Sequence, residues 1–220
     1  MTSRRVEVAA ERLGGWLERF AAQHGALTLQ VGEREIVATA TDGAVARCAV
    51  PFPPLPPPPP DAGPDAGLAA HVLAPRRVGV LLVRLGGHAV GVFDDATLVA
   101  SKVGSRQVHG RSAAGGWSQQ RFARRREGQV RVAHAAAAET AVTVLLPHVA
   151  TLDAVVTGGD RRSVEAVLSD VRLEKVRALV TPTLLDVPDP RRAVLDAAPG
   201  RYLSVPVTIT DPVSDHVRRG

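Results

Sequence analysis

The sequence predicts a mixed α/β fold, and three observations lead to that prediction. The first half of the chain holds short apolar and β-branched runs separated by turn residues, which is typical of antiparallel strands. From residue 118 onward, helical and strand-like runs alternate, so a mixed sheet with flanking helices is expected. Hydrophobic residues make up 45% and charged residues 22% of the 220 positions, a balance that supports a buried core of ordinary size.

The first 74 residues predict a helix, a β-meander and a connector. Apolar side chains recur near helical spacing over 6–23, and His24-Gly25 ends this pattern. Strand-like runs follow at 26–31, 35–41 and 44–50. Eight prolines in residues 51–60, and the lack of a hydrophobic period in 61–67, indicate an irregular connector over 51–74. It serves either as a plain spacer or as a ligand for a proline-binding module.

The remaining residues, 75–220, are expected to form one domain. Strand-like runs at 78–85, 88–93 and 96–103 indicate an antiparallel meander, and residues 104–117, rich in Gly, Ser and Arg, indicate a loop. Ser118 caps a predicted helix that runs to 146, before Pro147. The sequence then predicts strands at 152–157, 176–180 and 202–209, and helices at 163–170 and 189–198. With residues 1–50 as an N-terminal part, the chain is expected to form one compact unit overall.

The positive charge of the chain is concentrated in one window. Residues 102–131 hold eight basic residues and one acidic residue, whereas the formal charge of the whole chain is +5. Arg121, Arg124 and Arg125 share the first turns of the predicted helix. Cations at a helix N-terminus oppose the helix dipole, so helix stability does not explain them. A phosphate-rich partner such as RNA explains them, and a solvated basic face is the alternative.

The composition excludes several classes of protein. One cysteine and seven histidines without close ligand spacing exclude a zinc finger and an internal disulfide, and no metal or cofactor is expected. No apolar run approaches the roughly 20 residues of a membrane helix, and the first residues lack the apolar stretch of a signal peptide. These observations indicate a soluble, cytoplasmic protein without membrane contact, and we expect it to be a monomer.

A short motif lies inside the basic window. Gly104-Ser105-Arg106-Gln107 is a G-x-x-Q sequence, followed by small residues at 112–116 and an arginine-rich helix start at 120–126. This combination resembles the Vms-like release-factor family, which is related to the central domain of eukaryotic and archaeal class I release factors. The chain is most similar to the compact actinobacterial branch. Classical release factors place their glutamine directly after a Gly-Gly pair, whereas Gly115-Gly116 is followed here by Trp117.

The resemblance implies a fold, an activity and a site. The fold would be release-factor central-domain-like, with RNase H-like topology. The activity would be that of a peptidyl-tRNA hydrolase that frees nascent chains from stalled ribosomes or large ribosomal subunits, with peptidyl-tRNA and the large subunit as partners. The family's essential glutamine falls on Gln107 and its motif glycine on Gly104. The expected RNA-binding residues are Arg106, His109, Arg111, Trp117, Arg121, Arg124, Arg125 and Arg126.

The chemistry of ester hydrolysis also fits a loop that presents a glutamine. The reaction requires a water held in line with the carbonyl and donors aimed at the developing oxyanion. Glutamine presents a donor and an acceptor but is not a base at neutral pH, so we expect Gln107 to position the water through its side chain or backbone. His109 is open to a role as a base or as an RNA contact, and Trp117 to stacking on a nucleobase or packing within the protein.

Two other functions remain open from the sequence. A non-catalytic ribosome- or tRNA-binding module would use the basic loop only as an anchor, and replacing Gln107 would leave its activity unchanged. A metal-dependent nuclease would need converging carboxylates, and the candidates are Asp94, Asp95, Glu139, Asp153 and Asp160. Asp94 and Asp95 lie in a predicted hairpin turn, which favours turn chemistry for that pair.

Overall fold

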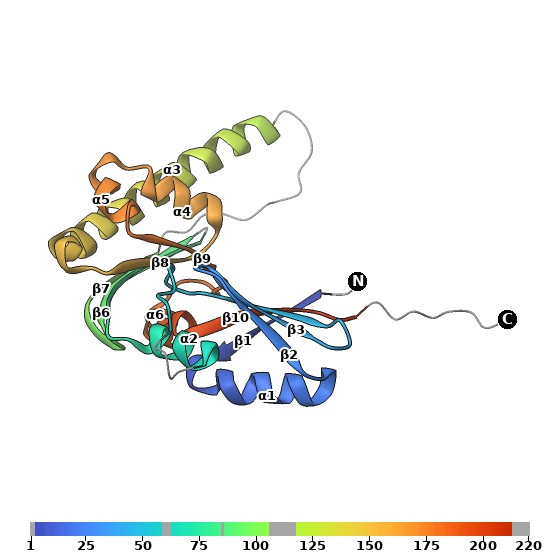
Figure 1. The fold of residues 1–220 in the computed structure, drawn as a ribbon. Helices are drawn as coiled ribbons and strands as arrows, with labels where there is room; N and C mark the ends of the chain where they lie inside the picture. The colour runs from blue at the N-terminus through green and yellow to red at the C-terminus, as the bar shows by residue number, and fades with distance from the viewer. Residues whose placement is uncertain (1–2, 59–62, 85, 106–117, 213–220) are drawn as a thin grey trace. The chain divides into compact units, whose positions relative to one another are not determined.

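The computed structural model describes residues 3–58, 63–84, 86–105 and 118–212, with side chains after the third gap described from residue 127. The chain divides into two compact units, residues 1–74 with 200–220, and residues 75–199. Each unit is built on a five-stranded sheet with helices packed against it (Figure 1). The predicted mixed α/β class is confirmed, with two sheets in the chain. The RNase H-like topology stays a prediction.

The first unit has an antiparallel sheet in the order β1-β10-β4-β3-β2. Its strands are β1 (Ser3–Ala9), β2 (Leu27–Val31), β3 (Glu35–Ala40), β4 (Val45–Ala49) and β10 (Ser204–Thr210). Helices α1 (Leu13–His24) and α2 (Pro64–Leu73) pack against this sheet (Figure 1). The last strand of the chain lies between β1 and β4, although the sequence assigned it to the domain that begins at 75. Alternating hydrophobicity identifies a strand, but it does not identify the strand's partners.

The N-terminal helix predicted over 6–23 starts later in the structure. Residues 6–9 belong to β1, where Val6 lies opposite Val207 and Val8 opposite Val205 of β10. A 3-10 turn over Ala10–Arg12 separates this strand from α1. The two valines fit a helical spacing and a strand spacing equally well, so only the pairing with β10 decides between them.

The connector predicted over 51–74 ends in a helix. Pro64 stands in the first turn of α2, where the missing N–H of proline costs nothing. Leu68 and Val72 are four residues apart and fully buried, so they lie on one face of the helix. The prediction of an irregular segment is therefore wrong for Pro64–Leu73, because the surrounding Pro and Gly residues mask a short amphipathic run.

The second unit has a mixed sheet in the order β7-β6-β5-β8-β9. Strands β5 (Arg77–Arg84), β6 (Gly87–Asp94) and β7 (Thr97–Ser105) form the predicted antiparallel meander. Strand β8 (Ala154–Gly159) pairs in parallel with β5, and β9 (Val180–Leu185) pairs in parallel with β8. The chain crosses from β7 to β8 through the long helix α3 (Ser118–Leu145), as a parallel strand requires a crossover connection.

Helix α3 supplies the main apolar contact with this sheet. Ala137, Ala141 and Leu145 are buried in one cluster with Val83 and Val90 of the strands. A 3-10 turn over Leu146–Thr151 follows, and the shorter helices are α4 (Arg161–Leu168), α5 (Glu174–Arg177), α6 (Arg192–Asp196) and α7 (Ala198–Tyr202).

The strand predicted over 176–180 is wrong for most of its length. Val176 is a buried residue of α5, and strand β9 begins at Val180. Short apolar runs do not distinguish a buried helical turn from a strand.

The stretch Glu127–Thr151 is long and apolar enough to cross a membrane by length and composition alone, which the sequence analysis did not expect. Its buried residues pack against the second sheet, and core helices of the same composition meet this criterion as well. The finding is therefore weak evidence for a membrane span.

Candidate functional site

The ends of four strands of the second sheet meet at one side of that sheet. Gly87 lies opposite both Ser105, at the end of β7, and Arg84, at the end of β5. Val83 of β5 lies opposite Gly159, at the end of β8, and β9 also ends there. We call this side the carboxyl edge. Open α/β sheets bind their ligands outside the carboxyl ends of the strands.

The segment singled out from the sequence is attached to the carboxyl edge. Strand β7 ends there at Ser105, and α3 begins at Ser118. The residues between them lie outside the described part of the chain, and they include five of the predicted site residues, namely Arg106, Gln107, His109, Arg111 and Trp117.

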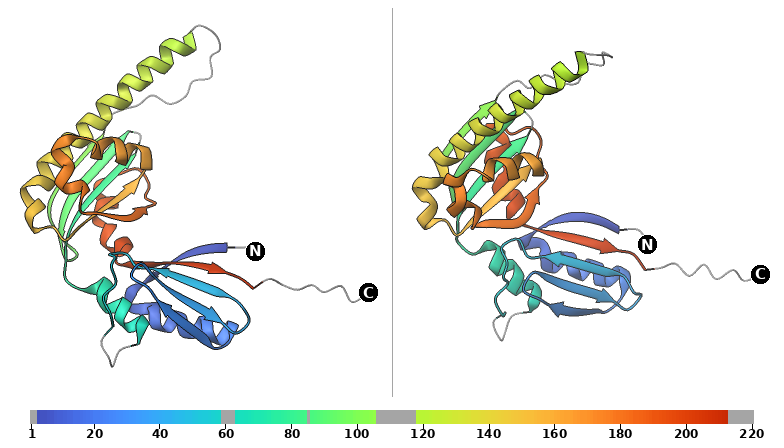
Figure 2. Two further views of the ribbon diagram at one scale, coloured as in Figure 1. Left: turned by 45° about the horizontal axis from the view of Figure 1, so that its top comes forward. Right: turned by 90° about the horizontal axis from the view of Figure 1, so that it is seen from above.

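The start of α3 projects beyond the carboxyl edge (Figure 2). The helix has 28 residues, which corresponds to a length of about 42 Å. Among its described side chains, the first buried one is Ala137, and Val132 is still 51% exposed. The backbone of the projecting part carries four predicted RNA-binding residues, whose side chains lie outside the described residues: Arg121, Arg124, Arg125 and Arg126.

Gly104 lies in strand β7 and not, as predicted, in the loop. Its neighbour across the strand pair is His88 of β6. A Cβ atom at position 104 would lie 2.5 Å from both Cε1 and Nε2 of the His88 imidazole, whereas carbon atoms pack at about 3.5–4.0 Å. A larger residue at position 104 would therefore force the imidazole or the strand to shift. From the sequence alone, the expected reasons for this glycine were the approach of the loop to tRNA and the conformation of the loop.

His88 is a candidate residue that the sequence analysis missed. It is 7% exposed, and its Nε2 lies 2.9 Å from Oγ1 of Thr140 on α3. The Thr140 hydroxyl donates to the Ala136 carbonyl at 3.0 Å. Because a hydroxyl has one hydrogen, the network assigns the Nε2 proton to His88, which donates to Thr140. The sequence offered one indication of this residue: His88 directly follows Gly86-Gly87 and starts a predicted strand.

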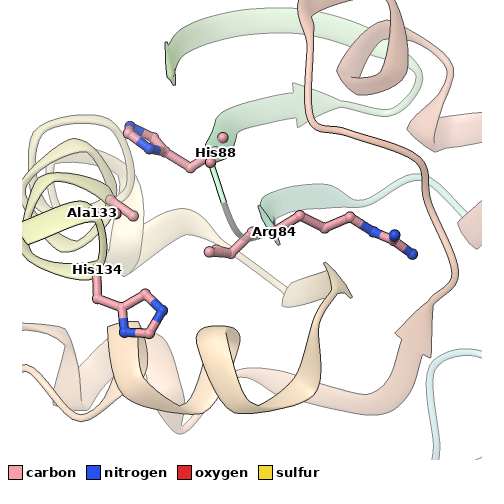
Figure 3. A pocket seen from close by; sticks show the side chains of 8 residues that line it. Arg84, His88, Ala133 and His134 are labelled. Carbon is pink, nitrogen blue, oxygen red and sulfur yellow. The ribbon is translucent and has the colours of Figure 1, made fainter. Parts of the chain in front are cut away.

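A small pocket opens at the carboxyl edge beside His88 (Figure 3). Its empty volume, which includes the open mouth, is about 230 Å³. The Arg84 guanidinium points away from His88 and His134 (Figure 3), and its Nη2 pairs with Oδ1 of Asp186 at 3.2 Å. The other lining residues are Val83, Gly86, Gly87, Ala133 and Ala137. The pocket therefore offers no converging set of catalytic groups.

The start of α4 borders the same edge. Asp160 caps this helix, and its Oδ2 accepts a hydrogen bond from the Ser163 N–H at 2.8 Å. Hydrogen bonds from the Ser163 side chain and backbone lower the pKa of Asp160, and Arg162 and His134 contribute favourable electrostatic interactions to the same shift. Arg161 and Arg162, the next two residues of the chain after Asp160, are exposed.

Three of the acidic residues considered for a nuclease site surround two arginines at the opposite side of the sheet. Asp94 accepts from Arg77 Nη2 at 2.8 Å, and Asp153 accepts from the Arg77 N–H at 2.7 Å. Asp95 accepts from the Arg76 N–H at 3.0 Å and has a positive φ of 54° in the hairpin turn. These carboxylates therefore stabilise the turn and the start of β5.

The other two acidic candidates also have structural partners. Glu139 pairs with Arg172 at 2.8 Å, and Asp160 caps α4. Within the part of the chain that the structure describes, no three His, Cys, Asp or Glu side chains lie together in a way that could hold a metal ion. The nuclease hypothesis therefore gains no support from the described residues.

Comparison with known proteins gives a family match and distant structural matches, two of which are described here. The model of the Actinobacteria/chloroflexi VLRF1 release factor matches residues 76–208. No curated protein matches the chain. Among solved structures, the archaeal translation termination factor aRF1 is similar with 16% identity and a TM-score of 0.41, over 76% of this chain and 51% of that chain. A second archaeal protein has 17% identity and a TM-score of 0.38, over 73% and 48%. The chain thus spans about half the length of the solved structures that it matches.

Proposed function

The chain belongs to the Actinobacteria/chloroflexi VLRF1 release factor family, whose model matches more than half of it, and on this premise we propose that it is a peptidyl-tRNA hydrolase. Family membership gives it a role in translation, at termination or in association with the ribosome. The proposed substrate is the ester between a nascent chain and its tRNA on stalled ribosomes or large ribosomal subunits. The factor acts in the cytoplasm as a monomer, without a metal or cofactor.

The observation that carries this proposal is the attachment of the G-x-x-Q sequence to the carboxyl edge. Gly104 is held in β7, and Gln107 follows three residues later in the chain, just after the strand has ended. The start of α3 projects beyond the same edge (Figure 2). A sequence that continues from the carboxyl edge into a glutamine and several arginines suits entry into a site built of RNA, where phosphates supply the complementary charge.

In the proposed mechanism, Gln107 holds the attacking water. The oxygen of this water forms a bond to the ester carbonyl carbon, the bond to the tRNA ribose oxygen breaks, and the ribose oxygen leaves with a proton. An amide is not basic at neutral pH, so Gln107 positions the water, and the ribosome and tRNA supply the remaining groups. RNA contacts are assigned to Arg106, His109, Arg111, Trp117, Arg121, Arg124, Arg125 and Arg126.

Release of a labelled nascent chain from purified large subunits that carry peptidyl-tRNA tests the proposal. We expect the wild-type protein to free the peptide. Binding of the subunits without any release would instead favour a non-catalytic ribosome- or tRNA-binding module, which the basic window of residues 102–131 supports as the second candidate.

A further inference from the structure

We propose that His88 is a positioning residue for this reaction, because its imidazole lies between α3 and the end of β7, the strand that directly precedes the segment with Gln107 in the sequence. The inference rests on the proposed function of Gln107. It adds a residue that lies in the packed part of the second unit, outside residues 106–117.

His88 and Thr140 are a polar pair between two apolar surfaces. Val90 and Val92, the next residues on the same side of β6, are fully buried against α3. The facing side of α3 consists of small and apolar residues, including Ala137, Ala141 and Val144. An apolar side chain of similar volume at position 88 would fill this space without the desolvation cost of an imidazole. The polar pair is therefore better explained by the orientation that its hydrogen bond imposes than by core stability.

One imidazole contacts the strand end and the helix at the same time. Nε2 of His88 lies 2.9 Å from Oγ1 of Thr140, and this hydrogen bond restricts the orientation of the ring. The ring also occupies the space beside Gly104 that a Cβ would need. A rotation of the ring toward β7 would bring it against the strand at Gly104, and loss of the hydrogen bond would remove one polar contact between the ring and α3.

The contact between His88 and Gly104 lies close in the chain to Gln107, whose position matters for the proposed reaction. Ser105, the last residue of β7, directly follows Gly104, and Gln107 follows Ser105 by two residues. A misplacement of about 1 Å at a reacting group lowers a rate roughly 10²-fold. The hydrogen bond between His88 and Thr140 is therefore expected to affect the rate of release, whereas binding depends on the basic residues of α3 and the segment before it.

Single-turnover release at saturating factor tests this inference through the hydrogen bond. Thr140→Val keeps the side-chain shape and removes Oγ1, and His88→Leu keeps a side chain at position 88 and removes Nε2. We expect each variant to lower the rate about 10- to 100-fold, with an unchanged half-saturating concentration. The double variant should be no slower than either single variant, because both remove the same interaction. Thr140→Ser should restore the wild-type rate.

Thr143→Val is the matched control. Thr143 lies on the same helix and donates the same kind of hydrogen bond, to the Glu139 carbonyl at 2.8 Å, but it is exposed. We expect this variant to release at the wild-type rate. Wild-type rates for Thr140→Val and His88→Leu, together with a slow Gln107→Ala, would overturn the positioning role and leave the proposed function standing. A wild-type rate for Gln107→Ala would identify the proposed function itself as the failure. A change in half-saturating concentration without a change in rate would also overturn the inference.

Discussion

Gln107 is the residue on which the proposed hydrolysis depends. We expect Gln107→Ala to lower the single-turnover rate of release by about 10² to 10³, because it removes one preorganised polar contact to the transition state. Binding to the large subunit should be retained, since phosphate contacts are made by other residues. His109→Ala should lose much less if its imidazole only contacts RNA. Release by Gln107→Ala at the wild-type rate would move the assignment to the binding module.

The effect of a side chain at Gly104 can be predicted, and Gly128, in the same unit, provides a control substitution. Gly104→Ala places a methyl group against the His88 ring, and we expect it to lower the free energy of unfolding by about 1–3 kcal/mol and to slow release. Gly128 lies on α3, and a Cβ there would meet nothing within 4 Å. Gly128→Ala should stabilise the protein by up to about 1 kcal/mol and leave release unchanged. Equal unfolding free energies for the two variants in chemical denaturation would contradict the steric explanation.

Asp42 introduces a pH-dependent contact in the first unit. It accepts hydrogen bonds from the Ala44 N–H at 2.8 Å and from His24 Nδ1 at 2.8 Å. These bonds, chiefly the one from Ala44, hold the pKa of Asp42 below its usual value, about 3.9 in an unfolded chain. The resulting stabilisation is fully present above that value and is lost as the pH falls through the lower folded pKa.

Asp42→Asn tests this contact through the pH dependence of stability. The free energy of unfolding of the variant should fall short of the wild-type value near neutral pH, and the two values should converge as the pH falls below about 4. Urea denaturation over a series of pH values measures the difference. A difference that stays constant across the acid range would show that Asp42 does not titrate as inferred.

The site residues differ in how far the sequence could identify them. A motif of four letters was enough to single out Gly104, but the reason for the glycine could not be known without the pairing of β6 and β7. His88 was not identified because its role depends on two neighbours that are far away in sequence, Gly104 and Thr140. A buried histidine and an exposed one look the same until the register of the strands is known.

Among the secondary-structure elements, α3 is the one that we expect to bind RNA. Replacement of Arg121, Arg124 or Arg125 by Ala should weaken association with the ribosome or tRNA and reduce the slope of log affinity against log salt by about 0.7–0.9 for each arginine. Folding stability should stay nearly unchanged, because these arginines belong to the first turns of α3, and the start of this helix projects beyond the sheet (Figure 2).

Arg172 is a suitable control for these arginine variants. Its guanidinium is already paired with Asp170 and Glu139, each at 2.8 Å, so Arg172→Ala should leave the salt dependence of binding unchanged. Binding titrations at several salt concentrations measure the slopes. If the slope is unchanged in all three α3 variants, those arginines form a solvated face.

Local sequence patterns predicted the elements whose partners are close in the chain. The meander of β5, β6 and β7 and the helix from Ser118 were predicted within a few residues, because turns and helical periodicity are local signals. β1 was mistaken for the start of a helix, because its partner β10 lies at the other end of the chain. β9 was placed too early, because Val176, the buried apolar residue of α5, precedes it by four residues.

For the whole molecule, the structure predicts that the first unit depends on the C-terminal residues. β10 contributes Val205, Val207 and Ile209 to the first core, and it is the strand that joins β1 to β4. A chain that ends at residue 199 should therefore lose the cooperative unfolding of its N-terminal part. Limited proteolysis should cleave residues 1–74 of this shortened chain much faster than those of the full chain. If residues 1–74 resist proteolysis equally in both chains, the first unit does not depend on β10.

The inner position of β10 also determines when the first sheet can form during synthesis of the chain. Synthesis proceeds from the N-terminus, so every strand of the second sheet leaves the ribosome before the first sheet can close. Cys48 lies opposite Val207 of β10, and burial raises the pKa of its thiol to about 12 in the finished fold. In nascent chains arrested at increasing lengths, this thiol should react with alkylating reagents until β10 has emerged and become protected afterwards. The N-terminal strands, although they are synthesised first, are thus expected to complete their sheet only after β10 has been synthesised.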